Sequence, residues 1–233
     1  MNNPGPALFH TTQWSMILSA AEDSGAALER LCRAYWRPLY GFARRSNHNQ
    51  HDAEDMVQGF LAKIFEKQWL RTVKRGEGSF RRFLQMAFRN YMIDQYDRTQ
   101  AQKRGGGTES VRLDAQDAEA FFAKELASSD TPETAYERAW ALEVFARARK
   151  ALRDECVAAG RAEAHDAIET GEPYPVIAER LGMSASAVTS FAFRVRRRLQ
   201  ELIRAEILQT VNSQADLEEE VSSLLRALSL KSS

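Results

Sequence analysis

Apolar residues recur every three or four positions between Phe80 and Arg104, the spacing that brings side chains onto one face of an α-helix. They are Phe80, Phe83, Leu84, Ala87, Phe88 and Tyr91. This pattern predicts a helix that buries its aromatic face. The remaining positions carry basic and amide groups: Arg81, Arg82, Arg89, Asn90, Arg98, Lys103 and Arg104. Such a face suits contacts with phosphates and bases, although a solvated charged face on a core helix has the same pattern.

Similar stripes predict helices elsewhere in the first half. One starts near Thr11 or Thr12 and carries Trp14. A second carries Leu28, Leu31, Cys32 and Tyr35, and Pro38 is expected to bend or interrupt it. After a turn at 46–50, a third begins at Asp52 with Met56, Val57, Phe60, Leu61, Ile64 and Phe65 on one side. The basic segment from Leu70 to Ser79 contains two glycines and is predicted to be a loop.

The second half follows the same rule, so we predict an all-α protein. Thr131 and Pro132 have the form of a helix start, and this helix is expected to continue to about Ala164. Gly171 and Pro173 break the chain before Tyr174–Arg204, which has the form of a helix-turn-helix with Gly182 at the turn and Ser184 as the cap. Its second helix has an inward stripe of Val188, Ala192, Val195 and Leu199. The opposite side carries Ser186, Thr189, Ser190, Arg194, Arg197 and Arg198. This arrangement favours DNA binding over a purely structural hairpin.

Charge is distributed unevenly, although 32 basic and 32 acidic residues balance overall. Residues 69–104 hold nine basic and three acidic residues, a net charge of +6, and residues 109–143 reverse those numbers to give −6. Residues 194–204 carry a net charge of +4. We therefore predict two small helical domains joined by an acidic flexible linker that contains one short helix around Phe121 and Phe122, with boundaries at 1–107, 108–131 and 132–208. A tail at 209–233 has Leu217, Val221, Leu224, Leu225 and Leu228 at helical spacing, which predicts a final amphipathic helix that packs back on the protein or engages a partner.

Composition argues against several other classes of protein. Cys32 and Cys156 are far apart in sequence and are expected to be buried free thiols, with neither a disulfide nor a zinc site. His48 and His51 lack a third ligand nearby and are expected to lie in a surface loop. No segment is long and apolar enough to span a bilayer, and the N-terminus lacks a signal peptide, so a cytoplasmic location is predicted. No catalytic constellation or phosphate loop is recognisable, so we expect neither an enzyme nor a cofactor.

Taken in order, these segments resemble the extracytoplasmic-function (ECF) group of bacterial RNA polymerase sigma factors from about Trp14 to Arg204. DAEDMVQGFLAKIF is similar to the helix of the second conserved region, and GEGSFRRFLQMAFRNYMIDQYDR to the segment that melts promoters and binds the minus-ten element. The acidic stretch lies where the interdomain linker belongs, and IAERLGMSASAVTSFAFRVRRRL is similar to the helix-turn-helix of the fourth region.

The resemblance implies partners and roles. Core RNA polymerase, through its beta-prime and beta subunits, and promoter DNA are the implied partners, and an anti-sigma factor or a regulatory kinase is a further one. Asp52, Asp55 and Gln58 become candidates for the polymerase contact, and the loop from Leu70 to Ser79 for base capture. Candidates for minus-ten DNA are Arg81, Arg82, Gln85, Arg89, Asn90 and Arg98. Candidates for minus-thirty-five DNA are Ser184, Ser186, Thr189, Ser190, Arg194, Arg197 and Arg198.

Three features depart from the family pattern. The segment from Leu152 to Pro173 is longer than usual, and Phe191 and Phe193 replace basic or polar residues. The leucine-rich tail lies outside the core pattern, and its apolar stripe motivates the hypothesis that it is an intramolecular regulator. Two rival functions remain open: a stand-alone helix-turn-helix regulator, and a helical adaptor with no DNA role.

Overall fold

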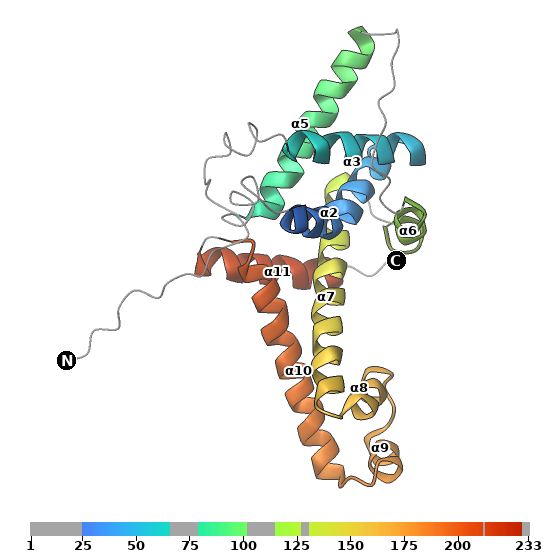
Figure 1. Ribbon diagram of the computed structural model, residues 1–233, viewed down its shortest axis with the longest axis vertical. Helices are drawn as coiled ribbons and strands as arrows, with labels where there is room; N and C mark the ends of the chain where they lie inside the picture. The colour runs from blue at the N-terminus through green and yellow to red at the C-terminus, as the bar shows by residue number, and fades with distance from the viewer. Residues whose placement is uncertain (1–24, 66–78, 102–114, 127–130, 212, 230–233) are drawn as a thin grey trace, which may run out of the picture. The chain divides into compact units, whose positions relative to one another are not determined.

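The computed structural model describes residues 25–65, 79–101, 115–126, 131–211 and 213–229, which form helices and turns without any strand (Figure 1). The predicted all-α class is confirmed. Within these ranges, no helix combines the length and apolarity that crossing a bilayer requires. The helix predicted around Trp14, and the loop predicted from Leu70 up to Gly78, lie outside them.

The chain divides into two compact units. Unit 1 comprises residues 1–142 and 208–233, and unit 2 comprises residues 143–207. The described elements of unit 1 are α2 (Gly25–Arg45), α3 (Gln50–Phe65), α5 (Phe80–Ala101), α6 (Ala115–Phe121), the π-helical turn η1 (Phe122–Leu126), the start of α7 (Pro132–Ala158) and α11 (Gln214–Ser229). Unit 2 holds the rest of α7, α8 (Ala162–Glu169), α9 (Tyr174–Arg180) and α10 (Ala185–Leu208) up to Ile207. The domain boundaries predicted from the sequence stay predictions, and the units divide the chain at other points, inside α7 and α10.

An aromatic core holds unit 1 together. Phe88 of α5 packs against Phe60 of α3, with ring centroids 4.9 Å apart, and against Phe42 of α2 at 5.9 Å. Phe42 also meets Tyr136, near the start of α7, at 6.4 Å in an edge-to-face contact. Such pairs stabilise a core beyond the burial of their area, by about 0.5–1.5 kcal/mol each. The stripe predicted for α5 is fully buried at Phe80, Leu84 and Phe88, whereas its other members, Phe83, Ala87 and Tyr91, are half-buried.

Of the two outcomes predicted for Pro38, a bend or an interruption, the interruption does not occur, and α3 begins earlier than expected. α2 runs without a break through Pro38, which is buried between Arg37 and Leu39. Tertiary packing of its aromatic neighbours thus outweighs the missing hydrogen bond that would otherwise interrupt the helix. α3 begins at Gln50 rather than at Asp52, because Asn49 caps it: the Asn49 side-chain oxygen accepts from the Asp52 amide at 2.9 Å, and its side-chain nitrogen donates to the Asp52 carboxylate at 2.7 Å.

Part of the predicted linker packs on unit 1. Glu119 of α6 accepts hydrogen bonds from the Arg44 guanidinium on α2 at 2.8 and 2.9 Å, and it also accepts from the Tyr40 hydroxyl. Burial disfavours ionisation of Glu119, but the hydrogen bonds from Arg44 and Tyr40 prevail and lower its pKa. Residues 115–126 are therefore helical, and Glu119 attaches them to α2 through hydrogen bonds.

In unit 2, the helix expected to reach Ala164 is two helices. α7 ends at Ala158 because Gly160 adopts a left-handed conformation with φ of 67°. The Arg161 amide then donates to the Cys156 carbonyl at 2.8 Å, and the Gly160 amide to the Val157 carbonyl at 3.0 Å. This pattern satisfies the last carbonyls of a helix and turns the chain. α8 starts two residues after Gly160, so the long segment before the helix-turn-helix supplies an extra short helix.

The segment predicted as a helix-turn-helix consists of α9, a turn at Gly182 and α10. Gly182 has φ of 61°, and the Ser184 hydroxyl accepts from the Ala187 amide at 3.2 Å to cap α10. Two apolar clusters join α7, α8, α9 and α10, one around Leu152 and Phe191 and the other around Ile177 and Val188. The remaining part of α7 lies alongside α10 (Figure 1), where Arg147 pairs with Glu206 at 3.2 Å.

The tail forms the predicted amphipathic helix, α11, and packs on unit 1. Leu217 and Leu224 are buried, whereas Leu225 is 59% exposed, so the predicted apolar face is corrected at that position. Glu220 lies on the buried face instead, with only 1% exposure. A buried carboxylate requires a cationic partner, and that partner lies on α5.

Candidate nucleic-acid and polymerase interfaces

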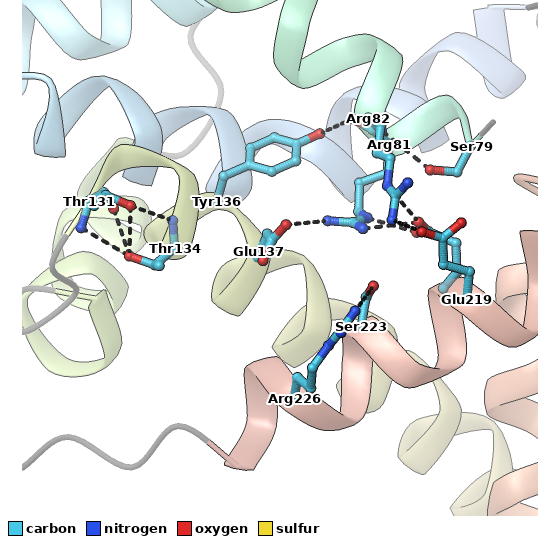
Figure 2. Close-up of polar contacts among 11 residues, drawn as sticks. Ser79, Arg81, Arg82, Thr131, Thr134, Tyr136, Glu137, Glu219, Ser223 and Arg226 are labelled. Atoms are coloured by element: carbon cyan, nitrogen blue, oxygen red, sulfur yellow. Dashed lines mark hydrogen bonds and ion pairs between the residues drawn. The ribbon is translucent and has the colours of Figure 1, made fainter. Parts of the chain in front are cut away.

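The first turn of α5 carries two arginines that α11 contacts. Arg81 is fully buried, and its guanidinium donates to the two carboxylate oxygens of Glu220 at 2.7 and 2.9 Å. Its second carboxylate partner is Glu137 at 3.3 Å. Arg82 donates to Glu219 at 2.7 Å, and Figure 2 shows both guanidinium groups directed toward the acidic side chains of α11. The expectation that Arg81 faces outward is therefore corrected, because a carboxylate 139 residues away draws it inside.

The environment of Arg81 keeps it charged. Burial disfavours the guanidinium charge, but the hydrogen bonds and attraction of Glu220 prevail and raise the pKa of Arg81 above its ordinary value. Its central carbon also lies 4.4 Å from the Trp140 ring centroid, a cation–π contact. The Tyr136 hydroxyl donates to the Arg81 carbonyl at 3.0 Å. Carboxylates, an aromatic ring and a tyrosine hydroxyl of unit 1 thus all contact Arg81.

Further along α5, the predicted minus-ten residues are more accessible. Asn90 and Arg98 are exposed, and the Arg89 side chain is 67% exposed, with a weak ion pair to Glu133 at 3.8 Å. Gln85 is half-buried, and its side-chain nitrogen has no hydrogen-bond partner among the described residues. The accessible part of the predicted face therefore runs from Arg89 to Arg98.

A groove of about 360 Å³ lies between α3 and α5 beside this accessible face. Asn90 reaches it, and Tyr91 forms its wall with the Lys63 ammonium 5.4 Å from the ring centroid. Met86, at the groove margin, is 67% exposed. Its aromatic and apolar walls can stack a planar group, and its polar lining combines the Lys63 ammonium and the Asn90 amide with the carboxylate of Asp94.

The three residues predicted to contact polymerase lie on α3. Asp52 and Asp55 are exposed near its start, where their negative charges interact favourably with the positive end of the helix dipole. Asp52 belongs to the capping interaction with Asn49, and Asp55 pairs with His51 at 3.2 Å. Gln58 is half-buried, and its side-chain oxygen has no hydrogen-bond partner among the residues described. Among those residues, no group of three metal-ligating side chains is present, and His48 and His51 belong to no such cluster.

The N-terminal half of α10 presents the polar residues predicted to meet minus-thirty-five DNA. Ser184, Ser186, Thr189, Ser190 and Arg194 are all exposed, while Val188, Ala192 and Val195 are buried as predicted. Phe191 and Phe193, which depart from the family pattern, differ in their burial. Phe191 is buried in the unit 2 core, whereas Phe193 is 67% exposed.

The arginines of α10 differ in their partners. Arg198 donates to both carboxylate oxygens of Glu155 on α7, at 2.8 and 2.9 Å, and to Glu201 at 3.0 Å. Arg197 pairs with Glu201 at 3.2 Å. Arg194 has no carboxylate partner within the described part of the chain, and its guanidinium lies 6.0 Å from the Phe191 ring centroid. Of the three predicted arginines, Arg194 is thus the one whose charge is available to an anion.

Sequence reasoning missed a second available cation. Arg161, the residue after Gly160, is exposed and lies over the same Phe191 ring at 5.5 Å. It also has no carboxylate partner among the described residues. Arg161, Ser190 and Arg194 line one groove of about 540 Å³ between the α7–α8 turn and α10. The glycine at 160 was the available signal, since it ends α7 and places Arg161 in a turn.

Comparison with known proteins identifies the first of these regions. Residues 31–102, which contain α3 and α5, match the family model of sigma-70 region 2. No curated protein and no solved structure matches the chain. Residues 31–102 are therefore similar to sigma-70 region 2, and this similarity supports a role in binding RNA polymerase and recognising promoters.

Proposed function

We propose that the protein is an ECF-type sigma factor, which binds core RNA polymerase in the cytoplasm and directs it to promoters with two DNA-binding modules. One observation carries this proposal: a sigma-70 region 2 match at residues 31–102 occurs in the same chain as a separate unit in which a turn joins the short helix α9 to α10. A helix-turn-helix alone would not distinguish a sigma factor from other regulators, whereas the two segments in this order are more specific. A sigma factor needs both, because it holds duplex DNA upstream while it opens the strands downstream.

The open strand of the minus-ten element is the proposed ligand of α5. Arg89, Asn90 and Arg98 present charge and amide groups, and the groove beside Tyr91 offers a wall against which a base can stack. Extracting a base from the stack costs a few kcal/mol, and stacking on an aromatic side chain returns about 1–3 kcal/mol per base. Arg82 and Gln85 are further candidates, whereas Arg81 can contact DNA only if Glu220 releases it.

The duplex of the minus-thirty-five element is the proposed ligand of α10. Ser184, Ser186, Thr189 and Ser190 at its start suit base edges and phosphates in the major groove. Arg194 and Arg161 supply the charge for the DNA backbone, while Arg197 and Arg198 are weaker candidates because carboxylates hold them. The exposed ring of Phe193 suits apolar contact with thymine methyl groups.

The polymerase contact is proposed for the exposed start of α3, through Asp52, Asp55 and Gln58. The decisive experiment mixes the purified protein with bacterial core polymerase and measures run-off transcription on a promoter library. Initiation at defined start points that depends on the protein is the expected result. If the protein binds operator DNA but never core polymerase, it is a stand-alone regulator. If it binds neither, it is a helical adaptor.

A pair of substitutions tests the backbone contact in unit 2. Replacing Arg161 and Arg194 with alanine should weaken holoenzyme binding to minus-thirty-five duplex and reduce the slope of log K against log salt by about 1 for each phosphate that the protein no longer neutralises. Arg153→Ala is the matched control, because Arg153 is exposed in the same unit but both its hydrogen bonds go to Asp166 at 3.0 Å. An unchanged slope in the double variant would show that these arginines do not contact phosphate.

A further inference from the structure

The acidic pair on α11 occupies the arginines at the start of α5. Glu219 and Glu220 contact Arg81 and Arg82 within 3.5 Å, and Arg81 has one further carboxylate partner, Glu137 of α7 at 3.3 Å (Figure 2). We propose that α11 is an internal substitute for the DNA backbone: it covers one end of the minus-ten surface and leaves when DNA phosphates replace its carboxylates. This inference rests on the proposed function of α5.

The geometry of the pair supports replacement by another anion. The Arg81 guanidinium meets Glu220 through two parallel hydrogen bonds, the fork geometry that also suits a phosphate. Arg82 lies at the edge, with 44% of its side chain exposed, beside a Glu219 that is 53% exposed. An incoming strand can therefore reach Arg82 first and compete with α11 from the solvent side.

The remaining contacts of α11 are of the kind that can be exchanged. Leu217, Leu224 and Ala227 are its buried apolar residues, whereas Glu218, Glu219 and Leu225 are exposed. Arg138 of α7 reaches the Ala227 carbonyl at 3.5 Å, a long hydrogen bond. Ion pairs that are partly exposed contribute little to stability, about 0–1 kcal/mol. The buried Arg81–Glu220 pair is thus the contact that specifies where α11 docks.

Replacement also explains why the cover is partial. The α11 contacts reach Arg81 and Arg82, while Arg89, Asn90 and Arg98 remain accessible. DNA can bind the accessible part of α5 first. Displacement of α11 would then add two guanidiniums to the contact, so the tail lowers DNA affinity without abolishing it.

The test compares two double variants of the full chain in complex with core polymerase. Glu219→Gln with Glu220→Gln removes the carboxylates that hold Arg81 and Arg82. Asp117→Asn with Glu218→Gln is the control: it changes the net charge equally, and both residues are exposed in unit 1. The readout is affinity for a forked minus-ten DNA, measured by fluorescence anisotropy. We expect the first variant to bind about fivefold more tightly or better, and the control to match the unaltered chain.

A second measurement needs no substitution and decides the matter even if the first variant fails to fold. Hydrogen exchange of the amides at 214–229 should accelerate when the unaltered holoenzyme is saturated with the forked DNA. Unchanged exchange there, or equal DNA affinity in a folded Glu219→Gln, Glu220→Gln variant and its control, would overturn the proposal. If instead the unaltered chain forms no transcribing complex with core polymerase, the proposed function fails.

Discussion

At the scale of single residues, the structure reverses the environment of Arg81. Its position directly follows Phe80, the first residue of the buried stripe, and neighbouring helical residues point about 100° apart, so Arg81 lies at the border of the buried face. Local sequence cannot decide on which side of such a border a residue falls. Glu220 decides it, together with the ring of Trp140.

Arg81→Ala should therefore destabilise the protein far more than removal of an exposed arginine. Without Arg81, Glu220 is a buried charge with no partner, which typically costs about 3–5 kcal/mol. Arg89→Ala, on the same helix, should cost about 0–1 kcal/mol, because its ion pair is long and exposed. Urea unfolding followed by circular dichroism measures both. Similar losses of stability for the two variants would contradict the buried pair.

Glu119 offers a pH-dependent counterpart. Because its pKa is lowered in the folded protein, it stabilises the fold above its ordinary pKa of 4.5, and this contribution disappears as the pH falls through the lowered value. Glu119→Gln should thus cost about 1.5–3 kcal/mol at neutral pH, the range for hydrogen bonds to charged groups, and progressively less below pH 4.5.

The control for this pH dependence is Asp117→Asn, on the same helix but exposed. Its unfolding free energy should follow that of the unaltered chain from neutral pH down into the acidic range where Glu119 becomes protonated. The measurement is urea unfolding at several pH values. A Glu119→Gln deficit that is constant across this range would show that the carboxylate charge is not responsible.

At the scale of elements, Gly160 sets the end of α7 and the position of Arg161. An alanine at 160 would meet no atom within 4 Å, so its only penalty is the left-handed backbone, about 1–2 kcal/mol. Gly160→Ala should lower the unfolding free energy by about this amount, and Gly160→Asn by less, since asparagine tolerates this conformation. Equal effects of both substitutions, measured by urea unfolding, would argue against backbone strain.

Elements defined by local chemistry could be predicted from the sequence. The stripes of α5 and α10 are buried as their spacing predicts, and Thr131 caps α7 by accepting from the Thr134 amide at 3.1 Å. Ser184 and Gly182 likewise behave as predicted. Each of these features depends on residues within about one helical turn of one another, so both partners of the interaction can be recognised in the local sequence.

Features that depend on distant partners could not be predicted. The acidic composition of residues 115–126 indicated a linker, but Glu119 packs there because Arg44 and Tyr40 lie on α2, 75 and 79 positions away. The sequence predicted that Arg197 and Arg198 could contact DNA, but in the fold Glu201 pairs with Arg197 and Glu155 pairs with Arg198. In the candidate site, residue type was therefore predictable, whereas availability for DNA required the fold.

At the scale of the whole molecule, segments that are far apart in the chain belong to the same unit. The tail after Leu208 belongs to unit 1, although unit 2 separates it in sequence from the other elements of that unit. The segment from Thr210 to Glu220 thus contacts the start of α5 in unit 1. Glu220 pairs with Arg81, and the Phe80 amide donates to the Thr210 carbonyl at 3.0 Å. Truncation of the tail would consequently affect unit 1 rather than unit 2.

This division predicts where local destabilisation spreads. Glu119→Gln should accelerate hydrogen exchange in α2, α3 and α5 and leave α9 and the first half of α10 unchanged, because the hydrogen-bond partners of Glu119 lie in unit 1. Gly160→Ala should do the reverse. Since the two sites lie in different units, their effects in the double variant should add within about 0.5 kcal/mol. α7 contributes to both units, so its two ends should respond separately. Exchange that accelerates along all of α7 with either substitution would instead mean that the two units unfold together.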